Sequence, residues 1–174
     1  MSNDNLIYYT AIKNGFTDVS AKLIVAQARL ESANYTSNVF KNNNNAFGMK
    51  FIGQKYATKG TPAPVNERVK NPNANVNFYA KYNNVGDSAK DLIERLLNIT
   101  RNGVTPEMLK KATSPEEYAA LQKKRGYFGG KAEDYAKMLK SLLKKVKIDE
   151  ANKSASFNPL ILIIIGFFFL TKVS

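Results

Sequence analysis

The chain has 174 residues, of which 44% are hydrophobic; this is enough for one buried core but leaves little for a second. It contains no histidine and no cysteine. These absences exclude a serine-histidine triad, a thiolate nucleophile and the usual zinc sites, so carboxylates remain for acid–base catalysis. The formal net charge of +12 predicts a polyanionic partner. Because no nucleic-acid motif accompanies it, we expect an acidic polymer or an anionic membrane, and no nucleic acid.

Two helices are predicted in the first 32 residues. The first covers residues 5–13 and ends at an Asn-Gly pair, which is typical of a left-handed cap. The second is capped by Thr17 or Asp18 and should end near Ser32. Apolar residues recur along it at intervals of four, three and four: Val19, Leu23, Ala26 and Leu30. Glu31 therefore lies in its last turn, at the edge of the buried stripe and next to a chain reversal, where it can face a cleft.

The middle of the chain lacks helical periodicity. Residues 35–50 are polar and rich in asparagine, which favours a loop. Residues 51–84 contain short extended stretches, among them 65–69 and 76–82, separated by proline-containing turns. We expect a small hairpin or short sheet here.

Helices resume in the second half. One is predicted from Asp87 or Ser88 to about residue 100, a second opens at Thr105-Pro106, and a capping box at 114–117 starts a third that ends at Gly126. The last covers residues 131–148. The predicted fold class is α+β: a mostly helical domain, residues 1–148, with one β-hairpin insertion and a groove between the two parts.

The C-terminus has a different composition. Residues 149–157 are polar and indicate a tether, whereas Leu160–Leu170 is an unbroken apolar run. The run is short for a bilayer span of about 20 residues, but the segment 158–174 with its flanks makes a marginal transmembrane helix. The alternative is a helix packed on the domain, which should show a polar stripe that this segment lacks. The N-terminal residues 1–5 do not have the pattern of a cleavable signal.

Glu31 is the acid to which the sequence assigns chemistry. A glutamate emerging from an apolar helix is desolvated, which raises its pKa and keeps it protonated near neutral pH. Cleavage of a glycosidic bond needs such a general acid. The alternative is a surface glutamate paired with Arg29 or a nearby lysine.

Four blocks in order carry a resemblance between residues 19 and 146. They are Glu31-Ser32, the segment Asn45-Ala46-Phe47-Gly48-Met49-Lys50, Glu67 followed by Phe78-Tyr79-Ala80-Lys81-Tyr82, and Gly126-Tyr127-Phe128 with Asp134-Tyr135-Ala136. This order resembles the glucosaminidase family of lysozyme-like cell-wall hydrolases. Many members have Gly-Trp-Gly after the catalytic Glu-Ser, whereas this chain has Ala33-Asn34-Tyr35.

The resemblance implies roles for the two glutamates. Glu31 is the general acid, and Glu67, as the only acid between residues 49 and 86, is the candidate to activate water. Glu67 is alternatively a solvated hairpin charge paired with Arg68 or Lys70. A third scheme uses the N-acetyl group of the substrate in place of a second carboxylate.

The remaining candidates are residues that would contact the substrate. Tyr35 and Phe47 are expected to stack on sugar faces, Asn44 and Asn45 to bond hydroxyl groups, and Gly48 to let the backbone approach the ligand. Tyr127 is expected to position the acetamido group or a water, with Tyr135 supporting that loop or belonging to the core. The asparagine tract is alternatively an ordinary loop.

The sequence therefore predicts a peptidoglycan hydrolase, an endo-β-N-acetylglucosaminidase that requires no metal or organic cofactor. Its predicted partners are glycan strands of peptidoglycan, a lipid membrane contacted by the C-terminal helix, and virion proteins. The expected location is a virion membrane or a bacterial membrane, from which the enzyme acts on the wall. The alternatives are a lytic transglycosylase on the same fold and a non-catalytic glycan-binding virion membrane protein.

Overall fold

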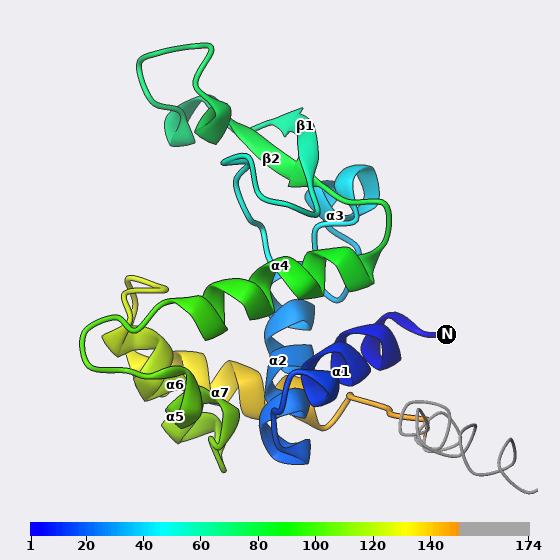
Figure 1. Ribbon diagram of the computed structural model, residues 1–174, viewed down its shortest axis with the longest axis vertical. Coiled ribbons are helices and arrows are strands. Elements are labelled where there is room, and N and C mark those ends of the chain that lie inside the picture. The colour runs from blue at the N-terminus through cyan, green and yellow to red at the C-terminus, as the bar shows by residue number, and fades with distance from the viewer. Residues whose placement is uncertain (150–174) are drawn as a thin grey trace, which may run out of the picture.

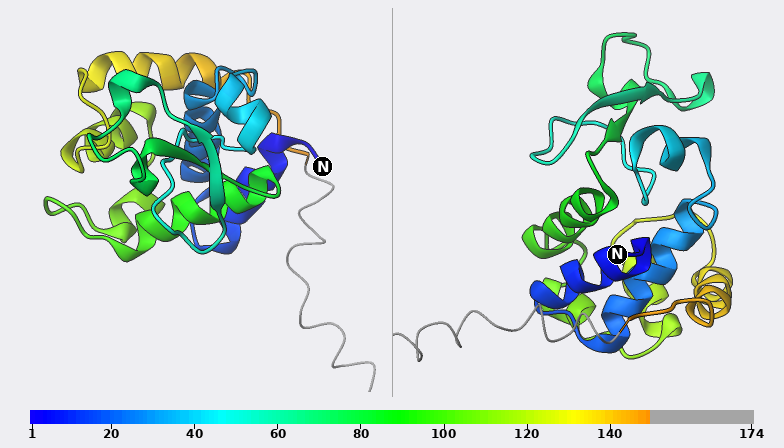
Figure 2. Two further views of the ribbon diagram at one scale, coloured as in Figure 1. Left: turned by 90° about the horizontal axis from the view of Figure 1, so that it is seen from above. Right: turned by 90° about the vertical axis from the view of Figure 1, so that its right-hand side faces the viewer.

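The computed structural model describes residues 1–149, which form a helical body and a smaller β lobe (Figure 1). We define the β lobe as residues 38–83. The remaining helices make up the helical body: α1 (Asn3–Lys13), α2 (Asp18–Glu31), α4 (Val85–Asn98), α5 (Pro106–Lys110), α6 (Pro115–Lys124) and α7 (Ala132–Leu143). Helix α4 lies between the β lobe and the rest of the helices, as Figure 1 and the right-hand view of Figure 2 both show.

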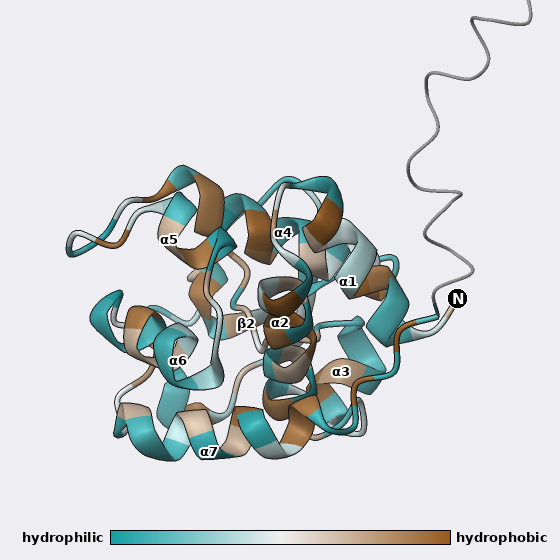
Figure 3. Ribbon diagram, turned by 90° about the horizontal axis from the view of Figure 1, so that it is seen from below, coloured by the Kyte–Doolittle hydropathy of each residue, from teal (hydrophilic) through white to brown (hydrophobic). Residues whose placement is uncertain are grey.

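Helix α2 is the centre of the helical body and is surrounded by the other helices (Figure 3). The Thr17 hydroxyl caps it by accepting from the Ser20 amide, and Ser32 forms its C-cap. Residues 23–28 of α2 are all fully buried, so its middle is enclosed on every side. The prediction that α2 buries a single apolar stripe is therefore only partly right. Val19, which was assigned to that stripe, is 40% exposed.

A third helix, α3 (Asn38–Asn43), occupies part of the segment predicted to be a loop. The Ser37 hydroxyl caps it by accepting from the Phe40 amide, and Asn44 ends it with a φ of 50°. The prediction was wrong here because a helix of 6 residues is too short to show a periodic apolar pattern.

The predicted small sheet is present in the β lobe. Strand β1 (Thr58–Pro62) pairs antiparallel with β2 (Phe78–Lys81), with Thr58 opposite Lys81 and an irregularity between Lys59 and Pro62. Residues 65–69, predicted to be extended, instead contain a single 3-10 turn, Val65–Glu67. Val65 is 78% exposed, so no packing surface favours a strand there. A second such turn, Asn75–Asn77, leads into β2.

The later helices start close to their predicted caps. Thr105 caps α5 and Ser114 caps α6, each with proline in the first turn. Helix α4 begins earlier than predicted, because the Asn84 side chain accepts from the Asp87 amide and acts as the cap. Helix α7 ends at Leu143, short of the predicted 148.

The chain after α7 runs back to α1. The Tyr9 hydroxyl donates to the Asp149 carbonyl at 2.6 Å, and the Asp149 amide donates to Asn5 Oδ1 at 3.0 Å. No helix within residues 1–149 has the length and hydrophobicity of a membrane span. The predicted transmembrane segment, 158–174, and the tether after residue 149 lie outside the described residues.

Candidate active site

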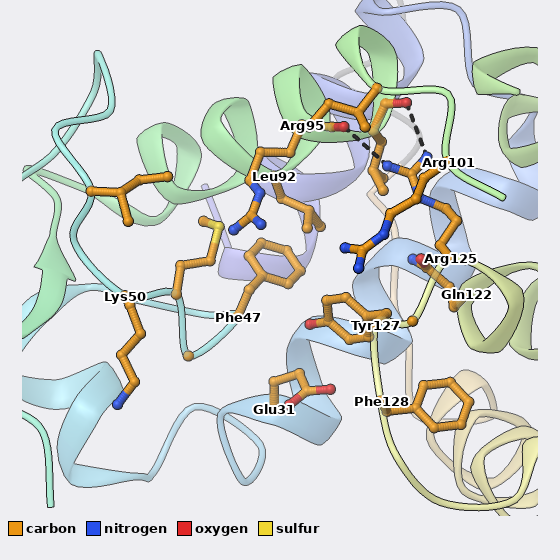
Figure 4. A pocket seen from close by; sticks show the side chains of 16 residues that line it. Glu31, Phe47, Lys50, Leu92, Arg95, Arg101, Gln122, Arg125, Tyr127 and Phe128 are labelled. Atoms are coloured by element: carbon orange, nitrogen blue, oxygen red, sulfur yellow. Dashed lines mark hydrogen bonds between the residues drawn. The ribbon is translucent and has the colours of Figure 1, made fainter. Parts of the chain in front are cut away.

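A cavity of about 520 Å³ opens between the β lobe and the helical body (Figure 4). Four segments line it: the end of α2, residues 47–52 of the β lobe, α4 with the turn after it, and residues 122–128. Of the predicted site residues, it brings together Glu31, Phe47, Gly48 and Tyr127.

Glu31 is the last residue of α2 and the one carboxylate among the described residues that line the cavity. The Tyr135 hydroxyl donates to its Oε1 at 3.1 Å. Desolvation raises the pKa of Glu31 above its ordinary value, and the bond from Tyr135 opposes that rise. Glu31 is an exposed residue, and it lines the cavity. The alternative interpretation, a pairing of Glu31 with Arg29, is not observed, since Arg29 binds Asp4 at 2.7 Å.

The turn after Glu31 is tightly constrained. The buried Ser32 hydroxyl donates to the Ala28 carbonyl at 2.6 Å and accepts from the Tyr35 amide at 2.9 Å. Ala33, Asn34 and Tyr35 follow with φ values of 51°, 55° and 66°. Three successive residues in the left-handed region are energetically unfavourable without glycine. Glu31 therefore lies at the end of a helix, directly before a turn whose backbone conformation is fixed by these hydrogen bonds.

Three aromatic residues, Tyr127, Phe128 and Tyr135, lie near Glu31 on the α6–α7 side. Phe128 stacks on Tyr135 with ring centroids 4.2 Å apart, which fixes the tyrosine that bonds Glu31. Tyr127 lines the cavity between Glu31 and the wall formed by α4 (Figure 4). Burial raises the pKa of both tyrosines, so their hydroxyls stay protonated and can donate.

The loop carrying Phe47 and Gly48 is shaped by Asn45. The buried Asn45 amide group donates to the Met49 and Ala80 carbonyls at 2.8 and 3.0 Å, and its oxygen accepts from the Phe47 and Met49 amides. Gly48 has a φ of 61°, which explains the glycine. Asn45 therefore supports the loop through backbone hydrogen bonds and is not among the cavity-lining residues.

Two further candidates also lie outside the cavity lining. Asn44 donates its side-chain amide to the Tyr82 and Asn83 carbonyls, which joins α3 to the end of β2. The Tyr35 hydroxyl donates to Asp4 Oδ1 at 2.9 Å, and its ring packs against Phe40. The structure therefore places these two residues outside the cavity lining, in hydrogen bonds within the protein.

Glu67 lies in the β lobe and is not among the cavity-lining residues. Lys50, which does line the cavity, contacts its carboxylate at 2.5 Å, and the Tyr79 hydroxyl donates to it at 3.1 Å. The hydrogen bond from Lys50 lowers the pKa of Glu67. The alternative to a catalytic role, an ion-paired Glu67, thus has Lys50 as the partner and not Arg68 or Lys70. Within residues 1–149, no three acidic side chains gather to hold a metal ion.

Arg95, Arg101 and Arg125 form a wall of the cavity that sequence reasoning missed. They come from α4, from the turn after it and from the end of α6. No local motif connects three arginines spaced this far apart.

A helical body, a small β lobe and an acid at the end of a buried helix between them define a lysozyme-like α+β protein. Residues 10–148 match the glucosaminidase family, described as mannosyl-glycoprotein endo-beta-N-acetylglucosaminidase, and the chain belongs to this family. The fold is similar to the catalytic domain of the autolysin Auto from Listeria monocytogenes, with a TM-score of 0.53 and 19% identity over 82% of this chain and 79% of that one. No curated protein matches the sequence.

Proposed function

We propose that the protein is a peptidoglycan hydrolase that cleaves glycan strands as an endo-β-N-acetylglucosaminidase. The observation that carries this proposal is Glu31, a carboxyl group with a raised pKa that lines a cavity at the end of a buried helix. Membership of the glucosaminidase family and the similar fold of a protein described as an autolysin support it. The net charge of +12 suits an acidic wall polymer.

In this proposal Glu31 donates its proton to the glycosidic oxygen as the bond to the anomeric carbon breaks. Tyr135 holds the carboxyl in place through its hydrogen bond, and Tyr127 faces the same space as a neutral donor. Glu67 then leaves its ion pair with Lys50, moves to the bound substrate and activates the water that completes hydrolysis. This step requires the β lobe to move. The substrate acetamido group is the alternative to Glu67 in this step.

A lytic transglycosylase is the second candidate, and one observation favours it. Among the described residues, Glu31 is the sole carboxylate in the cavity lining, while Glu67 is held by Lys50. A transglycosylase requires no carboxylate to activate water, because an oxygen of the substrate itself closes the ring.

The two candidates are separated by the new ends of digested wall. Mass spectrometry of purified peptidoglycan treated with the full chain should show reducing N-acetylglucosamine ends. Anhydromuramic ends would overturn the hydrolase proposal in favour of the transglycosylase. No new ends at all, with wild type and Glu31→Gln alike, would favour a non-catalytic glycan-binding protein.

We also propose that residues 158–174 anchor the protein in a bacterial or virion membrane, as their composition suggests. Flotation with liposomes tests this. The full chain should float with vesicles and a variant lacking 158–174 should not, whereas equal flotation of both would refute the anchor.

A further inference from the structure

The arginine wall, which we define as Arg95, Arg101 and Arg125, concentrates positive charge on one side of the cavity. Arg95 and Arg101 extend from that wall towards the cavity, opposite the position of Glu31 (Figure 4). Apolar residues of α4 and the segment after it, Leu92, Leu96 and Ile99, line the same wall. Charges beside apolar groups interact more strongly with a bound ion than charges in open solvent.

Arg125 is the most buried member of the wall, at 7% exposure. Its Nη1 donates to the Leu96 carbonyl at 3.3 Å and its Nη2 to the Arg95 carbonyl at 3.1 Å. These carbonyls lie in the last turn of α4, where the helix dipole is negative. Arg125 therefore joins α6 to α4 and holds the backbone of Arg95 in place.

Arg101 is positioned by a tight turn. Asn102 and Gly103 both have positive φ values, 52° and 73°, and Arg101 and Val104 exchange backbone hydrogen bonds at 3.3 and 3.0 Å. The Asn102 amide group also donates to the Lys124 carbonyl at 2.7 Å. The turn is thus bonded to the end of α6, and this contact holds the backbone of Arg101 in place.

The charge of the arginine wall is not balanced by acids. Among residues 1–149, the ion pairs include one arginine, Arg29, and none of the three in the wall. Burial lowers the pKa of Arg125. Tyr118 opposes this shift, and the charges of Arg95 and Arg101 add to it. Three clustered cations without a counterion repel one another, and a bound anion removes that repulsion.

We propose that the arginine wall binds a carboxylate carried by the glycan strand, so that the cavity selects acidic glycan over neutral glycan. The planar fork of a guanidinium matches a carboxylate with two parallel hydrogen bonds, which a lysine cannot offer. This carboxylate is either that of the lactyl ether on a peptide-free muramic residue or one on a stem peptide. The inference rests on the proposed function, since it assigns a second contact to the same substrate.

Binding to an inactive enzyme tests this without depending on turnover. The full chain carrying Glu31→Gln, in a non-ionic detergent, is titrated calorimetrically with three glycans: a neutral β-1,4-linked N-acetylglucosamine hexamer, peptide-free wall strands and peptide-bearing wall strands. Adding Arg95→Gln and Arg101→Gln should weaken binding of a carboxylate-bearing strand at least about tenfold and of the neutral hexamer less than about twofold. Arg125 is left intact because it supports α4.

The two wall strands identify the source of the carboxylate. A selective loss with peptide-free strands assigns the lactyl carboxylate, and a selective loss confined to peptide-bearing strands assigns the stem peptide. The matched control is Lys131→Gln with Lys137→Gln, which removes the same charge from the exposed surface around α7 and should change each affinity less than about twofold.

An equal effect of the arginine substitutions on neutral and acidic glycans, or no effect on either, would refute the carboxylate site. If wall digestion by the active enzyme still yields the expected ends, the proposed function survives that result. Failure of the Glu31→Gln protein to bind any of the three glycans would instead contradict the proposed function, and the arginine inference with it.

Discussion

The helical body and the β lobe differ in how they hold Glu31 and Glu67. On the helical side, Glu31 ends a buried helix and is bonded by Tyr135, which a stacked phenylalanine fixes in turn. On the β-lobe side, Glu67 is 43% exposed and is held by Lys50 and Tyr79 near the surface. Exposed ion pairs contribute little free energy. The proposed proton donor, Glu31, is therefore held in place by its neighbours. The ion pair of Glu67 with Lys50 is exposed and costs little to break, so in our proposal Glu67 can change partners when a substrate binds.

The largest expected effect is that of Glu31→Gln. It removes the proton donor but keeps the shape and the acceptor for Tyr135, so we expect the rate of wall digestion to fall at least about 100-fold. Turbidity loss of purified walls measures it, with Glu107→Gln on exposed α5 as the control. Digestion at the wild-type rate would remove Glu31 from the mechanism.

The same variant should not lose stability. Because the folded-state pKa of Glu31 is raised, the ionised carboxylate opposes folding once the pH exceeds the unfolded value. Removing the charge should therefore leave the melting temperature equal or higher above that pH, with the difference vanishing in acid. A lower melting temperature at neutral pH would show that ionised Glu31 stabilises the fold.

Glu67→Ala tests whether the mobile side takes part in chemistry. If Glu67 activates water, the variant should lose about 100-fold in rate, and added formate or azide should restore part of it. The same anions should not restore Glu31→Gln. Full activity of Glu67→Ala would show that Glu67 does not activate water and would favour the substrate acetamido group in that step. Of the two glutamates, only Glu31 would then take part in the chemistry.

A smaller effect is expected from Tyr135→Phe, which removes the hydrogen bond that holds the Glu31 carboxyl group. Loss of the hydrogen bond that lowers the pKa of Glu31 should raise that pKa further. Since the protonated form is the active one in our proposal, the alkaline limb of the activity profile should move to higher pH. Tyr56→Phe, which removes a tyrosine-to-Glu94 bond outside the cavity lining, is the matched control and should leave the limb in place.

The smallest effect concerns the turn behind Glu31. Ala33 has a φ of 51°, where glycine is unstrained, so Ala33→Gly should stabilise the fold by about 0.5–1 kcal/mol after the entropy cost of glycine is subtracted. Thermal unfolding measures it. Ala74→Gly at a φ of −61° should instead destabilise slightly, and the same sign at both positions would contradict a strained turn.

Local sequence signals predicted the helical side well. The cap at Thr17 and the end of α2 near Ser32 follow from side-chain chemistry, and they place Glu31 at the end of the helix. Short elements were less predictable: α3 has only 6 residues, too few for a periodic apolar pattern, and the turn at Val65–Glu67 contains no buried residue. Asn44 and Asn45 fit a sugar site by composition, but backbone carbonyls from β2 and from the chain just after it take up their amides.

The arginine wall shows the limit of reading a sequence locally. Its members are brought together by the packing of α6 against the end of α4 and by the turn after it. Nothing in the chain near any one of them marks it as part of a site. Charge composition indicated an anionic partner but not where that partner binds.

The central claim is that Glu31 is protonated when it meets the substrate. Carbon-13 NMR titration of the Glu31 side-chain carboxyl, assigned by its loss in Glu31→Gln, tests this most directly. We predict that it titrates above the ordinary range for glutamate and that its pKa coincides with the alkaline limb of the activity profile. A pKa at or below the ordinary value would contradict the account.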